Sequence, residues 1–299
     1  MPRVSVIIPT FNRAALLPRA VESALAAGSD TEVIVVDDAS TDETPRVCAG
    51  LLGIRYLRLE RNLGVAGARN AGVLESSAEL VTTLGDDDVR LPGSLDAQVR
   101  QLEASPEAAF CYGPVLLADA RRHLPTGALM PADGCPTGDI FWELLEGNFV
   151  PDLAVVARKR LLVEQNLFDT GLPLVEDWDM WLRLTERYPV VAVEEPVAIY
   201  RFPDPASGQL TSDSFGMLRQ TLRVQKSISA LPRPRAAPGA WRRARRRLLD
   251  KAYKALLFEA GNALAEGERA AAREKLRAAF RLRPLRAALG GPLLRLLTL

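Results

Sequence analysis

The sequence predicts an α/β protein with a mixed, mainly parallel sheet flanked by helices, followed by a C-terminal helical extension. Short apolar runs rich in β-branched residues alternate with helical periodicity four times within about 90 residues, a pattern typical of parallel strands joined by helical crossovers. Acidic side chains follow two of these runs directly. Charge is also unevenly distributed along the chain. From Arg233 onward there are 17 Lys and Arg and 5 Asp and Glu, whereas the preceding residues contain 21 Lys and Arg and 32 Asp and Glu. An acidic α/β body and a basic tail are therefore expected.

The first half of the chain supplies four strand-like runs. They are almost wholly apolar, as expected of parallel strands covered on both faces. Gly64, Gly67 and Gly72 allow close backbone approach, and the helix that they accompany could present its N-terminus to an anion. The expected order is strand 4–9, a helix carrying Leu17, Val21 and Leu25, strand 32–38, strand 54–59, helix 65–76 and strand 80–84.

The second half is less regular and ends in basic helices. We expect a helix carrying Leu95 and Val99, a strand over 109–113, an ordered loop or irregular insertion over 119–136, a helix over 140–145 and a strand over 153–157. Glu176 and Asp177 open a further helix, and strands follow over 190–193 and 197–201. The predicted domains are a body over 1–228, a Pro/Arg-rich linker over 229–240 and a basic helical subdomain over 241–299. The subdomain is expected to contain helices over 241–258 and 261–284, the second with a turn near Gly267.

Composition excludes several classes of site. The three cysteines form no Cys-x-x-Cys pair, and the single histidine, His123, rules out histidine-based triads and multi-histidine metal sites. The N-terminus lacks the features of a signal peptide, and no apolar run approaches the roughly 20 residues of a membrane helix. We therefore expect a cytoplasmic protein, with peripheral attachment to the inner face of the plasma membrane as an open alternative.

Asp86, Asp87 and Asp88 are the most informative residues. They follow the fourth strand-like run, and ligands of open α/β sheets bind outside the carboxyl ends of strands. Hard divalent ions such as Mg²⁺ or Mn²⁺ take oxygen ligands, so the acids predict a metal site at which the ion binds a diphosphate. The alternative is a solvated acidic turn. Dinucleotide and P-loop sites fit poorly, because no glycine follows the first strand and the segment 64–72 has neither lysine nor a hydroxyl residue.

Five segments in order resemble glycosyltransferase family 2, the inverting nucleotide-sugar transferases of GT-A (Rossmann-like) fold. The resemblance covers roughly residues 3–212 and rests on the segments 6–13, 35–42, 62–70, 86–92 and 176–181, which read VIIPTFNR, VVDDASTD, NLGVAGARN, DDDVRLP and EDWDMW. It implies a divalent cation, Mg²⁺ or Mn²⁺, and a nucleotide-sugar donor, with a UDP-sugar expected. It also implies transfer with inversion to the hydroxyl of a glycan or lipid-linked acceptor, in polysaccharide, glycolipid or other cell-envelope glycan synthesis.

The resemblance also implies roles for individual residues. Asp177 falls at the family's catalytic base, with Asp179 as the fallback. Asp87 matches the key metal-binding acid, assisted by Asp88 or Asp86. The residues expected at the nucleotide are Pro9, Thr10, Phe11, Arg13, Asp37, Asp38, Arg69 and Asp86, with Asp38 or Asp37 accepting from the base and Arg69 near the diphosphate.

Two departures from the family pattern keep a second hypothesis open, a non-catalytic scaffold that binds a sugar nucleotide. Gly85 stands where the family has its first acid, and Pro203 stands where many members have histidine. The basic tail has two interpretations as well. It could contact an anionic membrane, aided by residues 289–299, or form a helical subdomain that packs on the body or on a second subunit of a homo-oligomer. Nucleic-acid binding is not expected, because the body is acidic and no aromatic-interleaved basic platform occurs.

Overall fold

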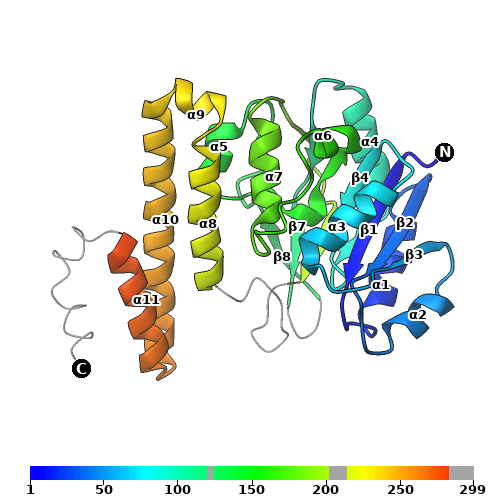
Figure 1. Cartoon of the computed structure of the whole chain (residues 1–299), viewed down its shortest axis with the longest axis horizontal. Helices are drawn as coiled ribbons and strands as arrows, with labels where there is room; N and C mark the ends of the chain where they lie inside the picture. Colours follow the sequence, from blue (N-terminus) through cyan, green and yellow to red (C-terminus); the bar gives the residue numbers. More distant parts are fainter. Residues whose placement is uncertain (120–123, 202–213, 283–299) are drawn as a thin grey trace. The chain divides into compact units, whose positions relative to one another are not determined.

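The computed structural model describes residues 1–119, 124–201 and 214–282. His123, Pro203 and the segment 289–299, which the sequence analysis singled out, lie outside these residues. The chain divides into two compact units, Met1–Leu144 with Asn148–Leu231, and Leu145–Gly147 with Pro232–Leu299. The first unit holds both sheets, and the second holds the C-terminal helices (Figure 1). The three-part division expected from the sequence stays a prediction.

The larger sheet has seven strands in the order β10-β6-β9-β4-β1-β2-β3. Parallel pairing joins β4, β1, β2 and β3, and also β10 with β6, whereas β9 runs antiparallel to both of its neighbours. The prediction of a mixed, mainly parallel sheet flanked by helices is therefore confirmed. The strand bounds are β1 Val4–Thr10, β2 Thr31–Asp37, β3 Ile54–Arg58, β4 Leu80–Thr83, β6 Phe110–Tyr112, β9 Val156–Arg158 and β10 Val191–Ala192.

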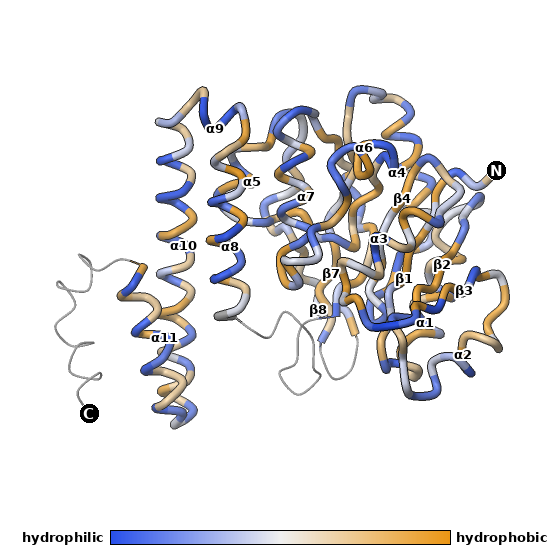
Figure 2. Tube along the Cα trace, viewed as in Figure 1, coloured by the Kyte–Doolittle hydropathy of each residue, from blue (hydrophilic) through white to orange (hydrophobic). Residues whose placement is uncertain are grey.

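Helices cover both faces of this sheet, as the apolar strands require. The helices of the first unit are α1 Leu17–Ala26, α2 Thr44–Gly50, α3 Gly64–Glu75, α4 Ser94–Glu103, α5 Phe141–Leu145, α6 Lys159–Glu164, α7 Glu176–Thr185 and α8 Ser214–Ile228. On one face Val6 and Ile8 of β1 pack in a core cluster with Leu17 of α1 and Leu95 of α4. Ile7 points to the other face, toward α3. Figure 2 shows hydrophobic residues gathered along these central strands.

Gly72 lets α3 approach the sheet closely. A Cβ added at Gly72 would lie 2.3 Å from Cγ2 of Ile7 and 3.1 Å from Cγ2 of Val36. Any larger residue would push the helix away from β1 and β2. The close backbone approach expected for these glycines is therefore observed at Gly72, where α3 packs against Ile7 and Val36.

A second, four-stranded sheet corrects one expectation. Its order is β5-β11-β7-β8, with bounds β5 Val89–Arg90, β7 Val115–Ala118, β8 Pro125–Met130 and β11 Ala198–Arg201. The insertion 119–136, expected to be irregular, contains β8, which pairs antiparallel with β7. This strand lies at the edge of the sheet and is exposed over nearly its whole length, so it lacks the apolar alternation of a buried strand. Its first residue is Pro125, which an edge strand tolerates.

The second unit is more continuous than expected. The segment 229–240, expected to be a linker, contains α9 Pro232–Ala236 and the start of α10 Pro238–Ala265, because proline is well tolerated in the first turn of a helix. The helix α10 also runs through Gly261, so the two predicted helices form one up to Ala265. Near Gly267, which has φ +82°, the chain turns into α11 Arg269–Leu282. In the part of the chain that the structure describes, no helix is long and apolar enough to cross a membrane.

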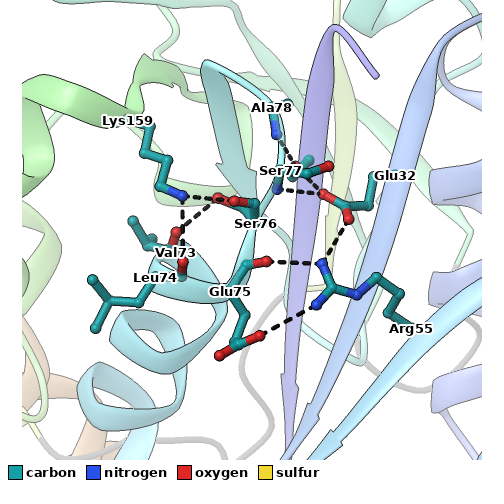
Figure 3. A network of polar contacts seen from close by, with 10 residues as sticks. Glu32, Arg55, Val73, Leu74, Glu75, Ser76, Ser77, Ala78 and Lys159 are labelled. Atoms are coloured by element: carbon teal, nitrogen blue, oxygen red, sulfur yellow. Dashed lines mark hydrogen bonds and ion pairs between the residues drawn. The ribbon is translucent and has the colours of Figure 1, made fainter. Parts of the chain in front are cut away.

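A network of polar side chains lies at the N-terminal ends of β1 and β2 in the larger sheet (Figure 3). Glu32 accepts hydrogen bonds from the Ser5 hydroxyl, from the Ser77 N–H at 2.9 Å and from Arg55 at 2.8 Å. Arg55 also donates to the carbonyl of Glu75 at 2.8 Å. On the other side, Lys159 Nζ donates to the Ser76 carbonyl at 2.6 Å. The two cations thus complement the carbonyl end of α3, where positive charge is favourable.

Replacing Glu32 with glutamine is expected to lower the thermal stability in a pH-dependent way. Burial raises the pKa of Glu32, but hydrogen bonds from Ser5, Ser77 and Arg55 outweigh it and hold the pKa at about 2. A carboxyl group whose pKa is lower in the folded state stabilises the fold at pH values above its unfolded-state pKa. This stabilisation is lost as the pH falls through the folded-state pKa. At pH 7 we expect Tm to fall by about 2–4 °C, the shift that loss of roughly 1 kcal/mol produces.

Calorimetry of Glu32→Gln between pH 7 and pH 2.5 tests this prediction. The difference in Tm from the native protein should shrink below a pH of about 4, where the unfolded carboxyl takes up its proton. Glu75→Gln is the matched control, because Glu75 is exposed and contacts the same Arg55 at 3.2 Å. An equal loss of Tm at pH 7 and pH 3 would contradict the prediction.

Candidate functional site

The candidate site lies where the order of the parallel strands reverses. From β1 the chain builds the sheet through β2 and β3 on one side and continues with β4 on the other. Such a switch point leaves a crevice outside the carboxyl ends of the two central strands. Thr10 ends β1, and its hydroxyl donates to Asp86, just after β4, at 2.8 Å. The acids predicted at a strand end therefore lie at the switch point itself.

Arg13 bridges the first two of these acids. Its Nη1 lies 3.1 Å from Oδ1 of Asp86 and 2.9 Å from Oδ2 of Asp87. Burial and the neighbouring charge of Asp87 together raise the pKa of Asp86 to about 6, although Arg13 lowers it. Arg13, expected at the nucleotide, is thus a counter-ion of the acids.

Asp88 is held by the end of a distant strand. Its Oδ1 accepts the Arg201 backbone N–H at 2.9 Å, and the Arg201 side chain lies 3.8 Å from Oδ2 of Asp87. Burial, and then the charge of Asp87, raises the pKa of Asp88 well above its ordinary value. Asp86 and Asp88 are only 5% and 7% exposed, so the alternative of a solvated acidic turn is wrong.

The residues present fit a divalent cation that a substrate helps to bind. A Cβ on Gly85 would lie 2.7 Å from Oδ2 of Asp88 and 3.1 Å from Oδ1 of Asp87, so these two oxygens converge over the glycine. They are not the atoms that contact Arg13 and the Arg201 backbone. Among the described residues no group of three or more His, Cys, Asp or Glu side chains could hold a metal ion. Two carboxylates suffice for Mg²⁺ when phosphates and water complete its shell.

The same geometry explains why glycine precedes the acids. A side chain at position 85 would collide with the carboxylates of Asp87 and Asp88 in this arrangement. The first acid of the family pattern would therefore require the carboxylates of Asp87 and Asp88 to move from these positions.

Arg69 is paired with acidic side chains of the protein. Its guanidinium is paired with Glu176 and, at 2.7 Å, with Oδ2 of Asp152, and its side chain is 12% exposed. Phe168 packs against the guanidinium carbon, 5.7 Å from the ring centroid. Arg69 therefore joins α3 to the start of α7, and any contact with a diphosphate stays a prediction.

Asp177 opens α7 beside this ion pair and keeps part of its surface accessible. Its Oδ2 accepts from Asn148 at 3.0 Å, and its Oδ1 accepts the Trp178 backbone N–H at 2.7 Å. Burial, together with the charges of Glu176 and Asp152, raises the pKa of Asp177 to about 7 against the opposing effect of Arg69. A carboxylate that titrates near neutrality suits a general base.

Asp179, the fallback base, belongs to a different environment. It is 4% exposed, and its Oδ2 accepts from Arg183, one turn along α7, at 2.7 Å. Arg183 in turn donates to the backbone of the loop after α6, at the Leu167 carbonyl at 2.9 Å. Asp179 therefore acts as a structural anchor for α7.

The two acids after β2 also differ from each other. Asp37 has no exposed surface and accepts from Tyr56 at 2.6 Å and from the Ser40 N–H at 2.8 Å, and its expected contact with a nucleotide base stays a prediction. Asp38 accepts the backbone N–H groups of Leu63 at 2.7 Å and Gly64 at 2.9 Å. The anion at the start of α3 is therefore this side chain.

The predicted site residues thus form a connected set at one edge of the sheet. The Asp38 N–H donates to the Thr10 carbonyl at 2.9 Å, and Thr10 leads through Asp86 to Arg13 and Asp87. Pro9 lies in β1 and Phe11 is 44% exposed directly beyond it. Asp177 is connected to this set through its neighbour Glu176, which pairs with Arg69. Arg69 pairs with Asp152, and Asp152 accepts a hydrogen bond at 2.6 Å from Thr83 at the end of β4.

The sequence matches the family described as glycosyl transferase family 2 over residues 5–159, more than half of the chain. The chain belongs to this family. The resemblance drawn from the five segments is therefore confirmed, and the acids after β4 lie within the matched part. Glycosyl transfer is the activity that membership of family 2 supports.

Relatives of this family 2 glycosyltransferase include two proteins named for succinoglycan biosynthesis. It is 28% identical over 269 residues to the succinoglycan biosynthesis protein ExoU of Rhizobium meliloti, covering 83% of the chain and 76% of ExoU. It is 37% identical over 108 residues to ExoO of the same organism, covering 35% of the chain and only 31% of ExoO. A Campylobacter jejuni enzyme named GalNAc(5)-diNAcBac-PP-undecaprenol beta-1,3-glucosyltransferase is 38% identical over 123 residues, covering 39% of each chain.

Solved structures establish the fold of the glycosyltransferase as GT-A. The mannosyltransferase PcManGT of Pyrobaculum calidifontis, in complex with GDP-Man and Mn²⁺, superposes with a TM-score of 0.61 at 19% identity, over 97% of this chain and 80% of that one. TarS of S. aureus in complex with UDP-GlcNAc also gives 0.61, at 18% identity, over 78% of this chain and 68% of that one. At these identities the likeness describes the fold alone.

Two site residues of the glycosyltransferase were missed for a clear reason. Asp152 and Arg201 lie 69 and 113 residues from the side chains that they contact, Thr83 and Asp88. The only local signals are the Pro151-Asp152 pair, which precedes an apolar run, and an arginine that ends a strand. Neither pattern distinguishes a site residue from an ordinary surface charge.

Proposed function

We propose that this glycosyltransferase transfers a sugar from a nucleotide-sugar donor to an acceptor hydroxyl with inversion at the anomeric carbon. The observation that carries the proposal is the set of contacts that joins Glu176 to Arg69, Arg69 to Asp152 and Asp152 to Thr83. It runs from the residue before Asp177 to the end of β4, three residues before Asp86. A candidate base and a candidate diphosphate site are thereby held together by one set of side chains. Geometry of this kind serves a displacement in which nucleophile and leaving group must be aligned.

In the proposed reaction the acceptor oxygen bonds to the anomeric carbon as the bond from that carbon to the diphosphate oxygen breaks. The acceptor proton passes to Asp177, whose raised pKa makes it a better base than an ordinary aspartate. Asp87 and Asp88 would hold Mg²⁺ or Mn²⁺, which when bound offsets the negative charge of the leaving diphosphate. Arg13 and Arg201 orient the same carboxylates. Phe11 offers an exposed ring on which the nucleotide base can stack.

The donor is expected to be a UDP-sugar, and the test is a panel of nucleotide sugars with and without Mn²⁺. Among the fold neighbours, one is in complex with UDP-GlcNAc and another with GDP-Man, so both bases belong in the panel. Release of nucleoside diphosphate with one base, dependent on Mn²⁺ and on an added acceptor, supports the proposal. A scaffold that only binds a sugar nucleotide would gain thermal stability from the donor without releasing nucleoside diphosphate.

We further propose an acceptor in a cell-envelope glycan, either a polysaccharide or a lipid-linked oligosaccharide. The support is the names of the relatives, two in succinoglycan biosynthesis and one that acts on an undecaprenol-linked oligosaccharide. An undecaprenol-linked oligosaccharide and a soluble oligosaccharide of the same sequence, assayed side by side, distinguish the two classes.

A lipid-linked acceptor agrees with the basic surface of α10, and we expect this helix to bind anionic membranes from the cytoplasmic side. Arg242, Arg243, Arg245, Lys251 and Lys254 are all exposed on it. A basic side chain near an anionic bilayer contributes about 1 kcal/mol of binding free energy. Replacing Arg242, Arg243 and Arg245 with glutamine should therefore weaken binding roughly 100-fold.

Sedimentation with vesicles tests this expectation. The native chain should bind vesicles that contain phosphatidylserine, bind phosphatidylcholine vesicles poorly, and lose binding as salt rises. The matched control replaces three arginines of the first unit, Arg46, Arg61 and Arg100, with glutamine, since this removes the same charge. Equal loss in both triple variants, or equal binding to neutral vesicles, would contradict a role for α10.

A further inference from the structure

Asp152 occupies a central place in the site, and no sequence pattern assigned it a role. It is the first residue of a short 3₁₀ turn, η1 Asp152–Ala154, directly before β9. Its Oδ2 accepts from the Thr83 hydroxyl at 2.6 Å and pairs with Arg69 at 2.7 Å. Its Oδ1 is buried and has no hydrogen-bond partner among the residues that the structure describes. A buried carboxylate that shares one oxygen between two donors requires a structural or functional reason.

The two contacts of Asp152 lead to the two halves of the site. Thr83 ends β4, and the acids that begin at Asp86 follow it. Arg69, on the other side, also holds Glu176, the residue before Asp177. Asp152 therefore links the strand that carries the candidate metal acids to the helix that carries the candidate base.

We propose that Asp152 is a positioning residue for the transfer reaction. It fixes Arg69, and through it the first turn of α7, against the end of β4, and its negative charge acts on Asp177. This inference rests on the proposed function, because it concerns the same base and the same acids. It adds a residue from a separate segment and a second means of tuning the base.

The charges around Asp177 determine in which direction its pKa should change when Asp152 is replaced. Glu176 on the same helix and Asp152 on η1 are negative, Arg69 on α3 is positive, and Asn148 is neutral. The two acids add to burial in raising the pKa of Asp177. Asp152→Asn removes one negative charge and weakens the ion pair of Arg69, and both changes favour the ionised form of Asp177. Its titration should therefore move to lower pH, by a shift on the order of one pH unit.

The first test is the pH dependence of kcat/KM for nucleoside diphosphate release. The native enzyme should lose activity as pH falls through about 7, and the midpoint should move down by about one unit in Asp152→Asn. Asp152→Glu restores the charge and should return the midpoint while kcat stays low, because the longer side chain displaces Arg69. Thr83→Val removes a hydrogen bond without changing charge and should lower kcat with an unmoved midpoint.

A second test does not depend on turnover. The Trp178 backbone N–H donates to Asp177, so its amide resonance should follow the titration of that carboxylate. With ¹⁵N-labelled tryptophan the chain has only 4 tryptophan backbone amides to assign. The titration should vanish in Asp177→Asn and shift to lower pH in Asp152→Asn.

The outcomes separate the two proposals. A native chain that releases no nucleoside diphosphate from any donor counts against the proposed function, and the amide titration still tests Asp152. A midpoint and an amide titration that both stay in place in Asp152→Asn overturn the inference, even where kcat falls. Asp133→Asn, an exposed acid of a loop, is the control for nonspecific charge effects and should leave both in place.

Discussion

Asp177→Asn is expected to lower kcat by roughly 10² to 10⁴, the usual contribution of a positioned general base. Asparagine has nearly the size of aspartate and can keep the hydrogen bond from Asn148, so α7 should retain its position. It cannot take the proton of the acceptor hydroxyl. The measurement is the rate of nucleoside diphosphate release at saturating donor and acceptor.

The pH dependence adds a signature to this prediction. Because burial, Glu176 and Asp152 raise the pKa of Asp177 to about 7, the native rate should increase as pH rises through neutrality and the base loses its proton. Asp177→Asn should lack this increase. Donor binding, measured by thermal shift, should be unchanged.

Asp179→Asn is the matched control on the same helix. Its carboxylate pairs with Arg183, so the substitution should lower Tm and leave the midpoint of the pH profile near 7. Native turnover in Asp177→Asn would exclude Asp177 as the base. Loss of the neutral midpoint in Asp179→Asn alone would assign the base to Asp179.

Asp87→Asn is expected to have the second large effect, on both metal binding and turnover. Oδ1 of Asp87 converges with Asp88 over Gly85, and Oδ2 contacts Arg13 at 2.9 Å. Removing the charge should weaken the proposed metal site, and a bound metal ion would stabilise the departing diphosphate by several kcal/mol. We expect kcat/KM to fall about 10³-fold or more, since each 1.36 kcal/mol is a factor of ten.

Titration of Mn²⁺ followed by electron paramagnetic resonance measures the metal directly, without and with nucleoside diphosphate. The native chain should bind Mn²⁺ more tightly in the presence of the diphosphate, because protein and phosphate oxygens share the ion. Asp87→Asn should lose most of this gain, while Asp133→Asn should keep it. Native Mn²⁺ affinity in Asp87→Asn would remove Asp87 from the metal site.

The sequence predicted the central part of the fold because its signals are local. The runs 4–9, 32–38 and 80–84 are apolar over their whole length, and the observed strands β1, β2 and β4 lie within one or two residues of them. A strand buried on both faces must be apolar, and period and length then identify it. The edge strand β8 has no such requirement, so its pairing with β7 was missed.

The candidate site divides in the same way. Its acids could be found from sequence, because Asp86, Asp87 and Asp88 follow a buried strand and Asp177 opens a helix. Their partners could not. Asp37 and Asp38 are adjacent and chemically identical, yet one is enclosed by Tyr56 and Arg58 and the other binds the start of α3.

The sequence by itself therefore determined the order of the central strands, the family and the carboxylates at the strand ends. Only the tertiary structure decided that Arg69 is held by Asp152 and Glu176, and that Arg13 and Arg201 contact Asp87. The physical reason is range. Periodicity and helix-capping preferences act within a few residues, whereas the charge that sets the pKa of a buried carboxylate comes from whichever distant segments pack beside it.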